Sequence, residues 1–205
     1  METSAYISLS LATALQRDLD VTANNIANAN TAGFKSERIA FEAMLERSPA
    51  GLETEFVVDV GSYADTRQGA LTQTGNPLDI SLNGTGWLSY KTAEGQIAYG
   101  RDGRFALSPD GELQTLSGAL VLDGGGGPIT LPPDAGEISI STDGTISSSA
   151  GPLAQIGVFD LPSIQSYNRL GAGMFAPPKG CLLYTSDAAD EDCLVGWGGV
   201  GGGVW

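Results

Sequence analysis

Aspartate is the residue type with which this chain of 205 residues could do chemistry. Asp102, Asp110 and Asp143 each precede a glycine in the middle of the sequence. A pair of carboxylates can hydrolyse a glycoside, and loop aspartates can bind calcium, although no twelve-residue loop has the spacing of calcium ligands. Asp-Gly pairs are also typical of tight turns. A structural role for the three aspartates is therefore favoured, and a β-rich carbohydrate hydrolase stays the weaker alternative.

Other kinds of active site find no support in the sequence. It contains no histidine that could act as a base and no Gly-x-Ser-x-Gly segment, so nucleophilic catalysis is not predicted. The glycine-rich segments 84–86 and 124–127 lack the Lys-Ser/Thr pair of a phosphate-binding loop and are expected to be tight turns. We predict no catalytic residue, no cofactor, no metal and no small-molecule substrate, which favours a structural or interaction protein over an enzyme.

Four aromatic residues lie in short β-like runs of the same region. Trp87, Tyr90, Tyr99 and Phe105 could line a ligand groove. Aromatic residues in short strands more often form the core or pair across strands, and this second interpretation is preferred.

The region that holds these residues has the pattern of a β-rich domain. Short alternating runs between residues 71 and 161 end at Asn-Gly, Glu-Gly or Asp-Gly pairs, which are strong hairpin signals. Regularly spaced turns indicate a sandwich or a partly closed barrel. The predicted fold class is α+β, mainly β, with a long N-terminal helix before a β-rich domain at residues 71–180. Strands are predicted at 56–60, 78–82, 87–90, 97–99, 105–107, 138–140 and 156–159.

A long amphipathic helix is predicted from Ser4 to about Ala29. A helix of about 25 residues spans roughly 37 Å, and an isolated helix is only marginally stable in water. Its apolar stripe therefore needs a partner surface, which is either the core of this chain or another chain; periodicity alone does not separate the two. The stripe consists of residues at helical spacing, namely Ile7, Leu11, Leu15, Leu19 and Ile26.

The predicted helix has an unusually polar end. Asn24, Asn25, Asn28 and Asn30 precede Thr31-Ala32-Gly33. Asparagine side chains bond to nearby backbone groups, and glycine adopts the left-handed conformation that stops a helix. We expect a core helix at residues 1–33, with Gly33 turning the chain towards a connecting arm at 34–70. Residues 34–45 fit either a short second helix or an extended segment.

The net charge of the chain limits the kinds of partner that it can bind. The net charge is −14, which disfavours binding to nucleic acid or anionic lipid. No apolar run reaches the roughly 20 residues of a membrane span, and residues 1–10 lack the basic and apolar regions of a secretory signal. A chain of this kind is expected in the cytoplasm, or is exported by a route that reads other signals.

The last 25 residues do not resemble the rest of the chain. Residues 181–190 read CLLYTSDAAD, which matches the translation of a transposon-type sequencing adapter, and a glycine-rich stretch without periodicity follows. Both cysteines, Cys181 and Cys193, lie there, so thiol chemistry is not expected. Residues 181–205 are predicted to be an adapter-derived artefact, which would leave the native sequence beyond Gly180 missing; a native glycine-rich C-terminus is the alternative.

Three segments together resemble the flagellar rod and hook protein family. They are ANNIANANTAGFK at residues 23–35, QGALTQTGNPLDISLNGTGWL at 68–88 and YGRDGRFALSPDGELQTLSGALVL at 99–122. The short stretch between Phe34 and Gln68, Trp87 after Gly86 and the acidic composition resemble the proximal-rod branch more than the distal-rod branch, which is the alternative. The hook protein is disfavoured because its large inserted domains are missing.

The resemblance implies a structural subunit of the flagellar basal body. It implies export by the flagellar type III apparatus, polymerisation in the periplasm with itself and other rod subunits, and a C-terminal helix that pairs with the N-terminal one. It also places an assembly interface on Ile7, Leu11, Leu15, Leu19, Asn24, Asn25, Ile26, Asn28 and Gly33. A free-standing secreted β-rich binding domain, such as an adhesin, remains a competing function, but an adhesin has no need of the N-terminal helix.

Overall fold

The computed structural model describes residues 2–47, 53–132, 135–161, 164–178 and 194–196. The chain forms two compact units. Unit 1 consists of residues 1–30 and 35–66, and unit 2 consists of residues 31–34 and 67–205. The chain therefore passes between the units three times within its first 67 residues.

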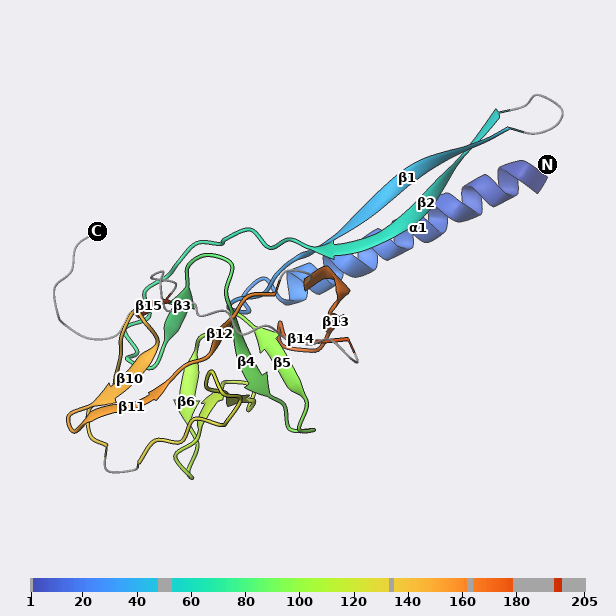
Figure 1. Ribbon diagram of the computed structural model, residues 1–205. Coiled ribbons are helices and arrows are strands. Elements are labelled where there is room, and N and C mark those ends of the chain that lie inside the picture. Colours follow the sequence, from blue (N-terminus) through green and yellow to red (C-terminus); the bar gives the residue numbers. More distant parts are fainter. Residues whose placement is uncertain (1, 48–52, 133–134, 162–163, 179–193, 197–205) are drawn as a thin grey trace. The chain divides into compact units, whose positions relative to one another are not determined.

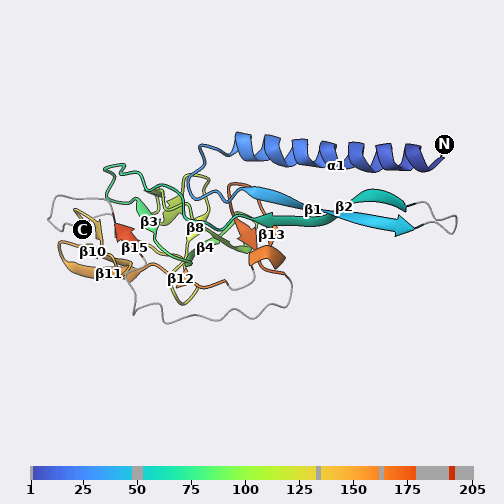
Figure 2. The same cartoon turned by 90° about the horizontal axis from the view of Figure 1, so that it is seen from above.

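Unit 1 is a long helix beside a long hairpin. The helix α1 (Glu2–Ala27) runs along the antiparallel strands β1 (Glu37–Arg47) and β2 (Glu53–Ala64), as Figures 1 and 2 show. The predicted long helix is confirmed, and of the two alternatives for residues 34–45 the extended one is correct. The strand predicted at 56–60 lies inside β2.

Polar contacts close the base of the hairpin. The Arg38 guanidinium lies 3.1 Å from the Asp65 carboxylate, and the Asp65 amide donates to the Ser36 carbonyl. The buried Lys35 ammonium donates to the Thr66 carbonyl at 3.1 Å. A two-stranded ribbon is marginally stable alone, so these contacts and the adjacent helix fix its start.

Unit 2 is built of antiparallel sheets that do not close into a barrel. The largest has eight strands, in the order β13-β14-β5-β4-β8-β7-β6 with β12 paired to β4, and a second has the order β11-β10-β9. The mainly β class is confirmed. The elements are β3 (Ile80–Leu82), β4 (Trp87–Lys91), β5 (Ile97–Gly100), β6 (Phe105–Leu107), β7 (Leu113–Thr115), β8 (Leu120–Val121), β9 (Ser139–Ile140), β10 (Thr145–Ser148), β11 (Gly151–Gln155), β12 (Val158–Phe159), the 3₁₀ turn η1 (Ile164–Ser166), β13 (Asn168–Arg169), β14 (Phe175–Ala176) and β15 (Leu194–Gly196).

A continuous apolar core holds unit 2 together. It gathers side chains from most strands, including the fully buried Leu88, Leu113, Val121 and Ile146. Several predicted turns have the left-handed glycines that tight hairpins need, for example Gly84 and Gly144. The segment 124–127 is also a tight turn, because the Asp123 carboxylate accepts hydrogen bonds from the Gly125 and Gly127 amides.

The predicted tail artefact is not tested by the fold. Residues 181–193 and 197–205 lie outside the described residues. The three residues between them, β15, pair antiparallel with β3. The origin of residues 181–205 stays a prediction.

Candidate assembly surface

The helix α1 has two faces of different character. Ile7, Ser10, Ala14, Val21 and Asn25 recur at intervals of three, four or seven residues and are buried or half-buried. Among the helix residues whose burial is described, 6–27, only Ala14 is fully buried. The covered face of α1 therefore consists mainly of small, β-branched and polar side chains, and of the predicted stripe only Ile7 belongs to it.

The exposed face of α1 carries large apolar side chains. Leu11, Leu15, Leu19 and Ile26 are 47%, 56%, 69% and 70% exposed. An ordinary surface helix turns its large apolar residues to the core and its polar residues to water. In α1 these large residues are exposed, so the helix alone offers an apolar surface about four turns long.

The asparagine-rich end of α1 is tied to the hairpin by one side chain. The Asn25 amide group donates to the Glu37 carbonyl and its Oδ1 accepts from the Glu37 amide, both at 2.9 Å. Such a reciprocal pair reproduces the hydrogen bonding of a β-bridge. Sequence periodicity could not reveal Glu37 as the partner, because the two residues are twelve positions apart.

The other asparagines and Gly33 take different roles. The Asn28 backbone amide and side-chain amide both donate to the Asn24 carbonyl, which closes the last turn, while the Asn24 side chain is exposed. Gly33 is left-handed, with φ +68°. It does not stop the helix, which ends at Ala27; it lies in the turn that follows, within unit 2.

Apolar exposure is concentrated in unit 1. Nine of the thirteen exposed large hydrophobic side chains among the described residues belong to it, although it contains less than half of the chain. Besides those of α1, Phe41, Met44 and Tyr63 of the hairpin are exposed. Contiguous exposed apolar surface marks interaction sites in folded proteins, so unit 1 is the candidate assembly surface.

The aspartates of unit 2 serve its turns. The Asp102 carboxylate accepts from the Arg104 amide and pairs with the Arg104 guanidinium at 2.8 Å, and this hydrogen bond raises the pKa of Arg104. Hydrogen bonds from the Thr145 amide and hydroxyl lower the pKa of Asp143. The structural interpretation of Asp102 and Asp143 is thereby confirmed; Asp110 is exposed in the turn between β6 and β7.

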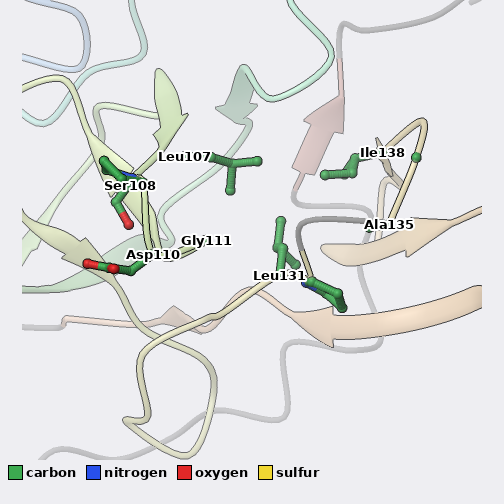
Figure 3. Close-up of a pocket in the computed structure, with 10 residues that line it drawn as sticks. Leu107, Ser108, Asp110, Gly111, Leu131, Ala135 and Ile138 are labelled. Carbon is green, nitrogen blue, oxygen red and sulfur yellow. The ribbon is translucent and has the colours of Figure 1, made fainter.

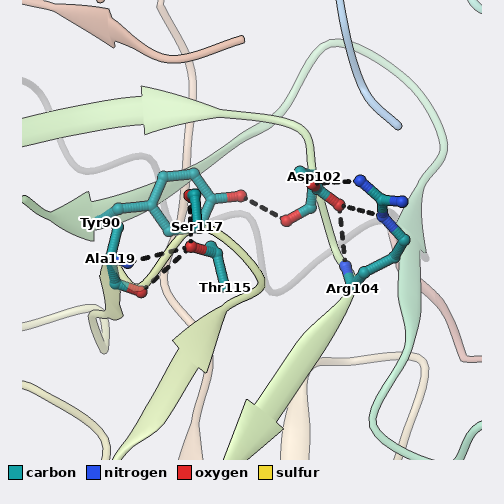
Figure 4. Close-up of polar contacts among 6 residues, drawn as sticks. All are labelled: Tyr90, Asp102, Arg104, Thr115, Ser117 and Ala119. Carbon is teal, nitrogen blue, oxygen red and sulfur yellow. Dashed lines mark hydrogen bonds and ion pairs between the residues drawn. The ribbon is translucent and has the colours of Figure 1, made fainter. Parts of the chain in front are cut away.

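The four aromatic residues belong to the core. Trp87, Tyr90, Tyr99 and Phe105 are all buried, and Trp87 packs edge-to-face on Phe175 with ring centroids 5.5 Å apart. The Tyr90 hydroxyl donates to the Asp102 carbonyl (Figure 4), and burial, followed by the Asp102 charge, raises the pKa of Tyr90. They therefore form no ligand groove.

A small hollow in unit 2 offers little chemistry. It holds about 210 Å³ and is lined by Leu107, Leu131 and Ile138 beside the turn of Asp110 and Gly111 (Figure 3). No cluster of three metal-ligating side chains occurs among the described residues. In the same residues, no helix combines the length and apolar character needed to cross a bilayer.

Comparisons with known proteins agree with an assembly role. Residues 6–35 match the family model of flagella basal body rod proteins, and residues 81–148 match that of the flagellar hook protein FlgE/F/G D1 domain. The chain is 37% identical to the flagellar basal-body rod protein FlgF of Caulobacter vibrioides, over 85% of this chain and 73% of the relative. It is 38% identical to FlgF of Rhizobium meliloti, over 82% and 69%, and 32% identical to the rod protein FlgG of Bacillus subtilis, over 84% and 72%.

One matched segment lies mostly in the helix of unit 1, and the other lies within unit 2. The rod model covers most of α1 and the turn after it, and the D1 model covers β3 to β10. The chain belongs to the flagellar basal-body rod protein family. Its place is the rod of the flagellar basal body, its character is structural, and it assembles with other rod subunits. The FlgF relatives fit it better than the FlgG relatives.

Proposed function

We propose that this chain is a FlgF-type subunit of the proximal rod, and that the exposed face of α1 becomes buried when subunits polymerise. The observation that carries the proposal is the reversed helix: large aliphatic residues face water and small ones face the hairpin. Burying a leucine side chain that was exposed contributes about 1.5–3 kcal/mol. Four such residues on each of many subunits would supply a large driving force for assembly.

The same surface suits a subunit that travels before it assembles. A type III export route needs a chain that threads a narrow channel, and a helix without a buried core of its own is readily unfolded. The flagellar export apparatus is therefore the proposed first partner, and polymerisation in the periplasm follows. In the rod, the subunits would transmit torque from the motor to the hook, and we expect no enzymatic activity.

The test places a charge in the stripe. In the chromosomal gene of the source strain, Leu15→Asp is expected to abolish swimming, because a carboxylate cannot be buried in an apolar interface without a partner. The purified variant should keep the unfolding midpoint of unit 2. Gln16→Asp, which places the same side chain on the neighbouring exposed position, is the matched control and should swim. Wild-type swimming of the Leu15→Asp strain would contradict the proposal.

A distal-rod position is the alternative, since FlgG relatives also align along most of the chain. Complementation separates the two. The proximal assignment predicts that the gene restores swimming to a strain that lacks FlgF and not to one that lacks FlgG. The opposite pattern would move this chain to the distal rod.

A further inference from the structure

The loop at residues 101–104, between β5 and β6, is fixed from the core of unit 2. The buried Tyr90 hydroxyl donates to the Asp102 carbonyl at 2.8 Å, and the Asp102 carboxylate holds Arg104 through its amide at 3.1 Å and its Nε at 2.9 Å (Figure 4). The Ile80 amide donates to the Gly103 carbonyl at 2.9 Å. Four separate hydrogen bonds therefore hold this short loop in one conformation.

The segment by which the chain first enters unit 2 packs against this loop. Thr31–Phe34 belongs to unit 2, and its turn is closed by the Phe34 amide, which donates to the Thr31 carbonyl. Gly33 lies directly on the backbone between Arg101 and Asp102: a Cβ at Gly33 would overlap the Arg101 carbonyl and lie 2.6 Å from the Asp102 nitrogen. The absence of a side chain at Gly33 allows this contact.

The segment by which the chain returns to unit 2 is bound to the same loop. The Arg101 guanidinium donates from Nη1 to the Gln68 Oε1 at 3.4 Å and from Nη2 to the Gly84 carbonyl. The Gln68 side chain also donates to the Leu82 carbonyl at 3.0 Å. Gln68 is the second residue after the return into unit 2.

Arg101 itself is built into the domain. It is 9% exposed, and its guanidinium carbon lies 5.7 Å from the centroid of the Trp87 ring. A buried guanidinium is tolerated only where its donors are bonded. A flexible contact at the surface would leave the Arg101 side chain exposed to water.

We propose that residues 101–104 form a clamp that fixes both connections between unit 1 and unit 2 to one rigid loop, with Arg101 as its positioning residue. Gly33 lets the segment 31–34 pack against the backbone of the loop, and Gln68 binds the segment that begins at Arg67 to the Arg101 side chain. The mechanical meaning rests on the proposed function: in a rod, these two segments are the covalent connections between the units.

Trypsin reports on the returning connection, because Arg67 begins it. In the purified full chain, Arg101→Met keeps an apolar side chain over Trp87 but removes the donors. Cleavage after Arg67 is expected to become about tenfold faster. Cleavage after Lys91, inside β4, reports global unfolding and should not change. Arg169→Met, which removes a guanidinium lying over the Phe175 ring, is the matched control for the loss of an arginine.

A second variant tests the contact made by Gln68 on its own. Gln68→Ala alters an exposed residue and should accelerate cleavage after Arg67 alone, measured relative to the same bond in the denatured chain. If Arg101→Met also accelerates cleavage after Lys91, the Gln68→Ala result decides the question. Unchanged cleavage after Arg67 in Gln68→Ala, or in a folded Arg101→Met, overturns the clamp. Because no rod is needed, a chain that fails to assemble would leave this result intact.

Discussion

Leucine has opposite surroundings in the two units. Leu113 and Leu88 of unit 2 are fully buried, whereas Leu19 and Leu15 of α1 are more than half exposed. Both units contain leucine, isoleucine, valine and phenylalanine, so the kinds of apolar residue do not distinguish them. The difference is that unit 2 closes its apolar surface within one chain, while unit 1 leaves its own open.

This contrast assigns different tasks to the two units. Unit 2 behaves as a domain whose stability comes from its own core. Unit 1 consists of elements that are individually marginal, a single helix and a two-stranded ribbon. Under the proposed function, unit 2 is the part that folds alone and unit 1 is the part whose burial neighbouring subunits complete.

The largest expected effect comes from one substitution made in both units. Leu113→Ala should lower the free energy of unfolding by about 2–5 kcal/mol, because it opens a cavity in a closed core. Leu19→Ala should change it by less than about 0.5 kcal/mol in the isolated chain. Urea unfolding followed by circular dichroism measures both. Equal losses would mean that the two units do not differ in the way described.

Gly33→Ala should be nearly as costly. The alanine would be strained at φ +68° and its Cβ would overlap the backbone of Arg101, so a loss of about 3 kcal/mol is expected in unit 2. Gly118→Ala is the control, since that glycine has φ +85° but nothing within 4 Å of the added carbon. It should cost only about 1 kcal/mol. If Gly33→Ala and Gly118→Ala lose the same free energy of unfolding, Gly33 does not lie this close to the backbone of Arg101.

A smaller effect is expected where α1 meets the hairpin. Asn25→Ala removes the acceptor of the Glu37 amide, so that amide should exchange with solvent about tenfold faster, as the loss of one half-buried hydrogen bond predicts. Asn24→Ala is the control, because the hydrogen bonds described for Asn24 use its backbone carbonyl. Unaltered exchange at Glu37 in the Asn25 variant would remove the link between helix and strand.

The smallest effect concerns a turn of unit 2 that pH should weaken. The pKa of Asp143 is lowered by hydrogen bonds from Thr145. Its contribution to stability is therefore present above the ordinary aspartate pKa of about 3.9 and is lost as the pH falls through the lowered value. Thr145→Val should raise the pKa of Asp143, measured by NMR titration of its carboxyl carbon, and Thr145→Ser should not. The same pKa in both variants would show that the hydroxyl has no influence.

Local sequence signals predicted the elements but not their partners. The helix and strands such as β4 and β5 follow from periodicity and turn residues, whereas residues 34–45 fitted either a short helix or an extended segment. The polar strands β10 and β11, TISS and GPLAQ, carry too little apolar alternation to be recognised. Long-range pairs such as Asn25 with Glu37, or Arg101 with Gln68, depend on the tertiary fold and have no signal in a single sequence.

The structure divides the predicted stripe between two faces of α1, and the sequence could not predict this division because it also depends on the tertiary fold. Helical spacing placed Ile7 with Leu11 and Leu15, but the hairpin covers the side of α1 that carries Ile7, Ala14 and Asn25. A periodic pattern identifies an apolar face without saying which element will cover it. The covering element comes from residues 37–64, and the remaining face stays open.

The most direct test of the account labels Leu19 in the free chain and in the rod. A chain with Cys181 and Cys193 changed to serine and with Leu19→Cys should react rapidly with a maleimide when purified, because this position is 69% exposed. In isolated basal bodies the same cysteine should be protected, and dissociation of the rods in denaturant should restore labelling. Equal labelling of Leu19→Cys in the purified chain and in intact basal bodies would contradict the claim that assembly buries the open face of α1.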